Sequence, residues 1–377
     1  MSVKMQQPPQ MADERTLSTR SAVGTVFGLE MRQRLRGRAW YIMLAVWFVV
    51  IGAVFLLALA TMGSYMDIGP MLFDLVVGFV LFFGLLVAPG LSANAVNGDR
   101  AAGTLAVLQV TLLTPGQLLA GKWLASWVGS LAFLVLSAPF IFWALALGGV
   151  PASEAFISLG MLALELGLVC AIGVGVSAIA NRPLFSIVAT YMLVALLSLG
   201  TLITFGLSTA LVMEEAEVTT SYYSYPMPAE DFDDQSPEPQ PGDPECTTET
   251  FVQPVAHTER ITWMLAANPF VVVADAVPYS RSTPGAGQSG DFGYVESYRP
   301  PGVMEGISQQ VRDFQAGPDY NVTCAESQGL ARDVDDKFPI WPLGLLLQSL
   351  LAGSLLVLGH RRLRTPVRRL AQGTRIA

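Results

Sequence analysis

The sequence predicts an all-α polytopic membrane protein. Of its 377 residues, 52% are hydrophobic and only 14% are charged, a composition that excludes an ordinary soluble domain. Several apolar runs approach the roughly 20 residues that a helix needs to cross a bilayer. Six such runs predict six transmembrane helices: Trp40–Thr61, Met71–Leu91, Leu118–Leu147, Ala155–Ala180, Leu184–Met213 and Phe338–Gly359.

The distribution of charge predicts the orientation of these helices. Most of the 22 Lys and Arg lie in the N-terminal segment, the loop after the second run, the turn after the fourth run and the C-terminal tail. Most of the 30 Asp and Glu lie in residues 214–337. Because basic residues favour the cytoplasmic side, we expect both termini in the cytoplasm and an acidic extracytoplasmic segment between spans 5 and 6 of a cell-membrane protein. This pattern gives no support to nucleic-acid binding.

The N-terminal 39 residues divide into two parts. Residues 1–20 are polar and predict a disordered cytoplasmic tail. Residues 21–39 predict an interfacial amphipathic helix, because apolar side chains recur at helical spacing beside alternating arginines. The alternative is that these arginines only set the topology. The apolar positions are Val23, Val26, Phe27, Met31 and Leu35.

The rest of the chain divides at the apolar runs. Residues 40–213 hold spans 1–5 and a cytoplasmic loop at 92–118, and residues 338–359 form span 6 before a basic cytoplasmic tail at 360–377. Within the extracytoplasmic segment 214–337, the composition of Ser221–Thr250 predicts a flexible acidic loop, and residues 259–279 predict short interfacial helices. Cys246 and Cys324 both lie in this segment, so they are expected to form a disulfide; the alternative is two free thiols.

The sequence offers little that could carry covalent chemistry. It has two histidines, neither in a ligand-spaced cluster, so we expect no catalytic residue and no metal site. The run from Gly116 to Lys122 partly matches a phosphate-binding loop, but Trp123 stands where Ser or Thr would bind magnesium. We therefore expect this chain not to be an enzyme and to bind no nucleotide itself.

Glu165 is the candidate intramembrane polar site. It lies near the middle of the fourth apolar run, where an ionisable side chain is costly and often functional. Glu165 could contact a polar substrate or a proton. The alternative is a protonated or hydrogen-bonded glutamate that holds neighbouring helices together.

The segment Gly98–Lys122 carries the most specific pattern in the chain. An acidic-basic pair precedes a glycine, a leucine-rich run and a Thr-Pro stop, which predicts a short helix on the cytoplasmic face. The segment resembles the first cytoplasmic loop of ATP-binding-cassette (ABC) transporter permeases of the type-2 export superfamily. The matching positions are Asp99, Arg100, Gly103, Thr104, Leu105, Leu108, Leu112, Leu113, Thr114, Pro115 and the downstream Lys122.

The resemblance implies a function and a set of partners. The loop would be a coupling helix that docks on an ABC ATPase subunit, present in two copies per complex, and the chain would pair with a second permease, identical or homologous. No cofactor would bind this chain, because ATP and Mg would bind the partner subunit. The chain would then be the permease subunit of an ATP-driven exporter. The alternative is a permease-like subunit that does not transport but transmits ATPase motion to an extracytoplasmic partner.

Overall fold

The computed structural model describes residues 18–62, 68–103, 113–224, 245–279, 302–324 and 338–364. Within these ranges, six helical segments are long and apolar enough to cross a membrane, which fits a multi-pass membrane protein. They comprise α2 (Arg38–Met62), α3 (Ile68–Ser92) continuing into α4 (Asn97–Ala101), α6 (Pro115–Ala146), α7 (Ala152–Ile179), α8 (Pro183–Ala195) continuing to α9 (Thr201–Thr209), and α13 (Trp341–Leu363). The prediction of a helical polytopic protein is confirmed at this level.

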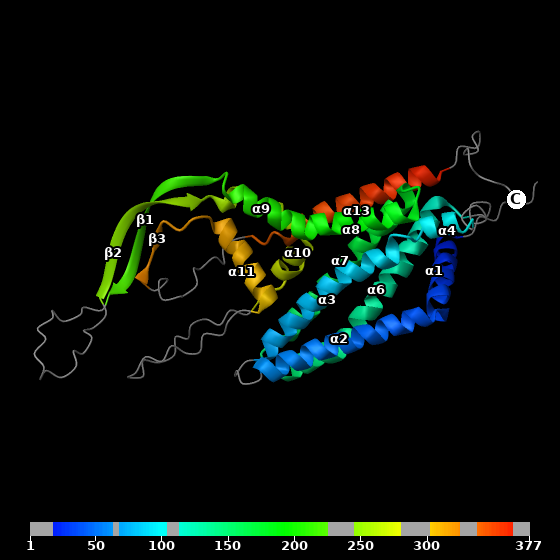
Figure 1. Cartoon of the computed structure of the whole chain (residues 1–377), viewed down its shortest axis with the longest axis horizontal. Helices are drawn as coiled ribbons and strands as arrows, with labels where there is room; N and C mark the ends of the chain where they lie inside the picture. Colours follow the sequence, from blue (N-terminus) through cyan, green and yellow to red (C-terminus); the bar gives the residue numbers. More distant parts are fainter. Residues whose placement is uncertain are drawn as a thin grey trace, which may run out of the picture.

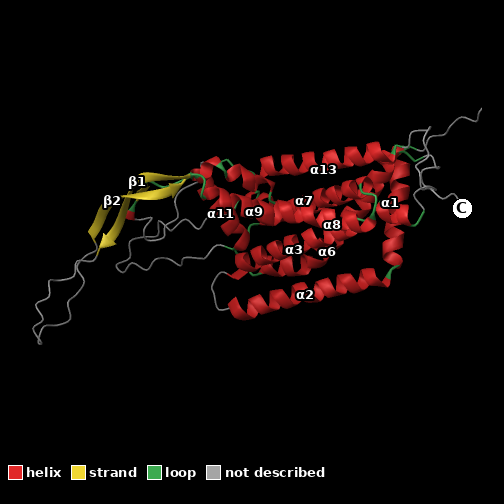
Figure 2. Ribbon diagram, turned by 45° about the horizontal axis from the view of Figure 1, so that its top comes forward, coloured by secondary structure: helices red, strands yellow, loops and turns green. Residues whose placement is uncertain are grey.

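The spans form an elongated bundle with a different structure at each end (Figure 1). Helix α1 (Thr19–Arg36) lies crosswise to the spans at one end, beside α4, and a β-sheet projects from the other end (Figures 1 and 2). We call these the α1 end and the sheet end. The crosswise position of α1 is the one expected for an interfacial helix.

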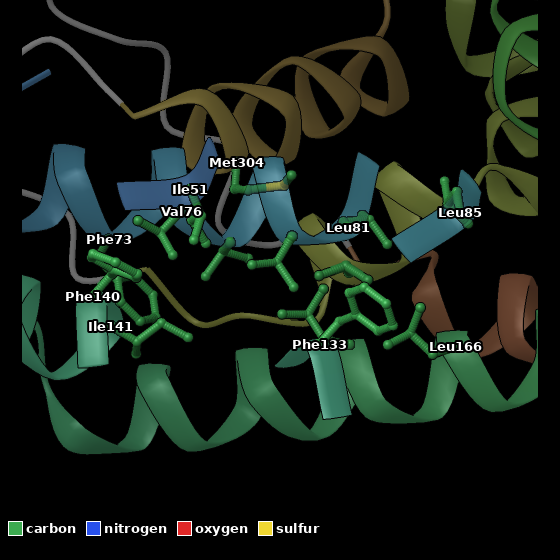
Figure 3. Packing of buried hydrophobic residues seen from close by; sticks show 14 of the residues in the cluster. Ile51, Phe73, Val76, Leu81, Leu85, Phe133, Phe140, Ile141, Leu166 and Met304 are labelled. Atoms are coloured by element: carbon green, nitrogen blue, oxygen red, sulfur yellow. The ribbon is translucent and has the colours of Figure 1, made fainter. Parts of the chain in front are cut away.

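Helices α3 and α7 are the most enclosed spans, and the main apolar core lies around them. Leu81 of α3, Phe133 of α6 and Leu166 of α7 belong to this core, and Met304 joins it from α11 (Val303–Ala316) at the sheet end (Figure 3). The Trp47 indole N–H of α2 lies 3.1 Å from both the Phe133 carbonyl oxygen and Ser137 Oγ. Its polar atom is therefore satisfied inside the apolar core, as burial in a membrane requires.

The fifth span is interrupted by one turn of π-helix. Helix α8 (Pro183–Ala195) passes into η1 (Leu196–Gly200) and then α9 (Thr201–Thr209). The Asn268 side-chain amide donates to the Ser198 carbonyl oxygen at 2.8 Å and to Thr201 Oγ1 at 2.9 Å. A buried asparagine thus contacts the backbone at the point where the regular helix is interrupted.

Asn268 belongs to a buried turn between two short helical pieces. The 3₁₀ pieces η2 (Thr258–Arg260) and η3 (Thr262–Ala267) precede it, and α10 (Pro269–Asp275) follows. These are the short helices predicted at 259–279. Helix α10 is almost wholly buried, and Gln348 of α13 donates to the Ala267 carbonyl oxygen at 3.2 Å, so these pieces pack against the spans.

The sheet at the sheet end is absent from the all-α prediction. Strands β1 (Met213–Ser224) and β2 (Glu245–Ala256) pair antiparallel, and the short β3 (Asn321–Val322) pairs parallel to β1, in the order β2-β1-β3. Both ends of the predicted flexible loop 221–250 therefore lie in strands, while 225–244 falls outside the described residues. Thr, Val and Tyr favour extended structure, and Thr219 and Thr250 form a cross-strand side-chain hydrogen bond of 3.0 Å.

Two carboxylates fasten the elements of the sheet end to the spans. Asp74 of α3 accepts from the Glu305 backbone N–H at 2.9 Å, so it caps the first turn of α11. Asp275 accepts from the Ile340 and Trp341 backbone N–H groups at 2.6 and 3.2 Å, so it caps the start of α13. Burial raises the pKa of Asp275, opposed by these backbone hydrogen bonds and by Arg312.

Candidate functional site

The predicted coupling residues gather at the α1 end of the bundle. Asp99 and Arg100 lie in α4, Gly103 ends the described part of the loop, and Thr114 and Pro115 begin α6. The remaining predicted coupling residues fall outside the described residues: Thr104, Leu105, Leu108 and Leu112. The structure therefore shows how both ends of the loop are attached to the bundle.

A buried lysine joins three helices at this end. Lys122 of α6 forms ion pairs with Glu30 of α1 and with Asp99 of α4, the latter at 2.6 Å. The Lys122 side chain is 1% exposed, whereas Glu30 and Asp99 keep 19% and 24% of their side-chain surface exposed. A buried ammonium needs such partners because an uncompensated charge costs several kcal/mol. Lys122 thus ties the start of the loop to α1 and α6.

Close backbone packing accompanies this ion-pair cluster. A Cβ on Gly121 would lie 2.6 Å from the Cβ of Val26, so only glycine lets α1 approach α6 this closely. Arg34 of α1 reaches further in and donates to the Leu91 carbonyl oxygen at 2.9 Å and to Ser126 Oγ at 3.1 Å. Burial lowers the pKa of Arg34, and the neighbouring Glu30 opposes this effect. The arginine thereby attaches α1 to the end of α3.

Helix α4 is attached to the end of α7. Ser177 Oγ accepts from the backbone N–H groups of Val96 and Asn97 at 3.0 and 3.1 Å, which satisfies donors at the start of α4. Arg100 donates to the Ala180 carbonyl oxygen at 2.5 Å and to Asn97 Oδ1 at 3.0 Å. The first predicted coupling residues are therefore fixed on α7 as well as on α6.

The two described edges of the loop have local conformations that suit their residues. Gly103 adopts φ +74°, the left-handed region that glycine enters without a steric penalty, just after α4 ends. Thr114 and Gln117 form a reciprocal capping box at the start of α6, with Pro115 in its first turn. Thr-Pro, which the sequence prediction treated as a stop for the preceding segment, thus also starts α6.

Sequence reasoning missed the roles of Glu30 and Lys122. Lys122 entered the prediction as the downstream lysine of the loop pattern and as part of an incomplete phosphate-binding motif, yet that run lies in the first turns of α6, where Lys122 forms ion pairs. The signal was a single lysine inside an otherwise apolar helix, which demands a carboxylate nearby. The sequence alone does not say which of the many carboxylates provides it.

Glu165 lies away from this cluster, buried within the span bundle. Its side chain is 1% exposed, and neither of its carboxyl oxygens has a hydrogen-bond partner among the described residues. The neighbouring polar side chain is Gln348 of α13, whose Oε1 also lacks a donor. These unsatisfied oxygens are all acceptors, so the site suits a neutral glutamic acid or a ligand that donates hydrogen bonds.

The sheet end holds the predicted cysteine pair and a surface charge network. Cys246 of β2 and Cys324, just after β3, form a disulfide. Arg260 donates to Glu214 at 2.6 Å and lowers the pKa of that exposed carboxyl. In the described ranges no group of three or more His, Cys, Asp or Glu side chains is arranged to hold a metal ion.

A comparison with models of known protein families finds no match, and a comparison with curated proteins also finds no similar sequence.

Proposed function

We propose that this chain is the membrane-spanning permease subunit of an ATP-driven ABC exporter in the cell membrane. In this proposal both termini and the loop between α4 and α6 face the cytoplasm, and the sheet end is extracytoplasmic. A separate ATPase subunit, present in two copies, binds ATP and Mg and hydrolyses the ATP. The loop docks on that subunit, and a second permease, identical or homologous, completes the path.

The observation that carries the proposal is the attachment of both loop edges to several spans. Asp99 connects the first edge to Lys122 of α6, which also pairs with Glu30 of α1, and Arg100 connects the same edge to the end of α7. The capping box at Thr114 makes the second edge continuous with α6. A force applied to the loop would therefore reach three or more helices together, as coupling of ATPase motion requires. The rest of the support is the resemblance of residues 98–122 to the permease loop.

The experiment replaces residues 104–112 with a Gly/Ser linker of equal length and leaves every described contact in place. The tagged chain is purified from its native membrane, and the bound ATPase subunit and its ATP hydrolysis are measured. We expect the wild-type chain to retain an ATPase subunit and the variant to lose it. A matched control replaces nine residues within 225–244, which should leave ATPase binding unchanged. Undiminished ATPase binding and hydrolysis in the 104–112 variant would refute the proposal.

A second candidate function is a permease-like subunit that passes ATPase motion to an extracytoplasmic partner. The observation in its favour is the long β1–β2 hairpin, which projects away from the spans and is linked through Cys246 to the segment after α11 (Figure 1). Deleting residues 225–244 separates the two functions. A transporter should keep substrate flux, whereas a signalling subunit should lose its extracytoplasmic partner.

A further inference from the structure

A groove opens on the surface of the α1 end, where α7 turns into α8 beside the end of α13. Its volume is about 590 Å³, and its lining includes the turn residues Asn181 and Arg182, the first turns of α8, and Arg362 of α13. The groove therefore lies at the boundary between a polar turn and the start of a candidate membrane span.

Positive charge gathers at this groove. Arg362 donates to the Ile179 carbonyl oxygen, and Arg100 donates to the next carbonyl, that of Ala180. The two guanidinium groups are close enough to repel one another electrostatically, and exposed Arg182 stands at the same turn. Among the described residues no carboxylate forms an ion pair with any of the three arginines. Residues 365–377 contain further arginines and no Asp or Glu.

The wall of the groove below the arginines is apolar. Leu184, Phe185 and Val188 of α8 line it and are 74%, 65% and 53% exposed. An exposed apolar wall that begins at a basic turn matches the two parts of a phospholipid, because basic pockets at a membrane interface bind phosphate headgroups and the adjoining helix contacts an acyl chain. A soluble anion would use the arginines but would leave this wall uncovered.

We propose that this groove is a binding site for an anionic phospholipid, with its phosphate on Arg182 and Arg362 and an acyl chain along Leu184, Phe185 and Val188. Since Arg362 and Arg100 hold neighbouring carbonyls at the end of α7, a phosphate here would also lower the repulsion between them. The site would then stabilise the attachment of α4. The inference does not depend on an ATPase partner.

The test measures lipid retention on the purified full-length chain by native mass spectrometry, with phosphatidylglycerol and phosphatidylcholine of identical acyl chains. We expect the wild-type chain to retain phosphatidylglycerol preferentially. Each basic residue near a membrane surface contributes roughly fivefold to binding, so R182Q/R362Q should weaken retention about 30-fold. The control R32Q/R36Q removes the same charge from exposed positions of α1 that do not line the groove, so it should change retention at this site less than about threefold.

A second variant tests the apolar wall with the arginines intact. Val188→Trp fills the groove from an exposed position, so folding should be unaffected while phosphatidylglycerol retention falls at least tenfold. Equal retention of the two lipids, equal losses in the two arginine variants, or wild-type retention by Val188→Trp would each overturn the proposal. So would displacement of the lipid by millimolar inorganic phosphate, which would indicate a site for a free anion. If R182Q/R362Q retains the lipid as wild type does but no longer co-purifies with a protein that wild type retains, the arginines bind that protein instead.

Discussion

Replacing Lys122 with methionine tests whether the ion-pair cluster of Glu30, Asp99 and Lys122 holds the α1 end together. Methionine approximates the apolar stem of lysine but carries no charge, so both carboxylates lose their shared partner. Lys122 is 1% exposed, and the carboxylates are 19% and 24% exposed. Water can therefore hydrate Glu30 and Asp99 in part after the substitution.

The exposure of the carboxylates sets the expected magnitude. Removing one partner of a fully buried ion pair costs about 3–5 kcal/mol, and solvent access lowers this, so we expect a loss of about 2–3 kcal/mol for Lys122→Met. At roughly 2–4 °C per kcal/mol, the unfolding temperature should fall by about 4–12 °C. The triple variant Glu30→Gln, Asp99→Asn, Lys122→Met removes all three charges of the cluster together. Its stability should return to within about 1 kcal/mol of wild type.

The assay is thermal unfolding of the detergent-purified chain, followed by tryptophan fluorescence. Arg36→Met, an exposed substitution on α1, is the matched control for loss of a positive charge, and it should shift the unfolding temperature by less than about 1 °C. The reasoning fails if Lys122→Met behaves like Arg36→Met, or if the triple variant is as unstable as the single one. Either result would show that the three charges do not act as a unit.

Three further predictions concern other parts of the molecule. Gly103→Ala should lower the free energy of unfolding by about 1–2 kcal/mol, because alanine is strained at φ +74°. The control Gly24→Ala lies in a helix and has equal free space for a Cβ, so in the same assay it should be neutral or stabilising by up to about 1 kcal/mol. Arg260 lowers the pKa of Glu214, so the stabilisation from this pair should be present above the ordinary carboxyl pKa of 4.5 and lost as the pH falls through the lowered value. Hydrogen exchange at the start of β1 should therefore be slower in wild type than in Glu214→Gln at neutral pH, and this difference should disappear once the pH falls below the lowered pKa. Glu165→Gln should leave the unfolding temperature within a few degrees of wild type, because a neutral acid and an amide are similar in size and polarity. Glu165→Lys should lower the unfolding temperature strongly because it buries a charge, and a wild-type unfolding temperature for this variant would contradict the burial of Glu165.

Hydropathy predicted the spans because a helix that crosses a bilayer needs a long run of apolar residues, and such a run is visible in the sequence without knowledge of the fold. The predicted run Met71–Leu91 corresponds to α3 at Ile68–Ser92, with Pro89 inside its last turn. The predicted end of the fifth span at Met213 was too late, since the helix ends at Thr209 and Met213 begins β1. Apolar residues such as Leu211 and Met213 follow the helix directly, so hydropathy does not mark where the helix ends.

The sheet and the ion-pair cluster depend on partners distant in sequence, which explains why they were missed. Strand β1 pairs with β2 across residues 225–244, and its many Glu and Thr side chains show no alternation of apolar and polar faces. Lys122 pairs with Glu30 and Asp99, which lie 92 and 23 residues earlier in the sequence, respectively. The loop motif identified Asp99, but only the folded structure shows that Glu30 and Asp99 share Lys122 as their ion-pair partner.

Helix α13 is fixed to its neighbours at both of its ends and along its length. Asp275 holds its first backbone N–H groups, Arg362 reaches the end of α7, and Gly175 and Gly359 bring α7 and α13 into backbone contact. Neither helix can slide or bend alone without losing one of these contacts. We therefore expect the pair to move together, so that a displacement of its α1 end reaches the buried Asn268 turn through α13 itself.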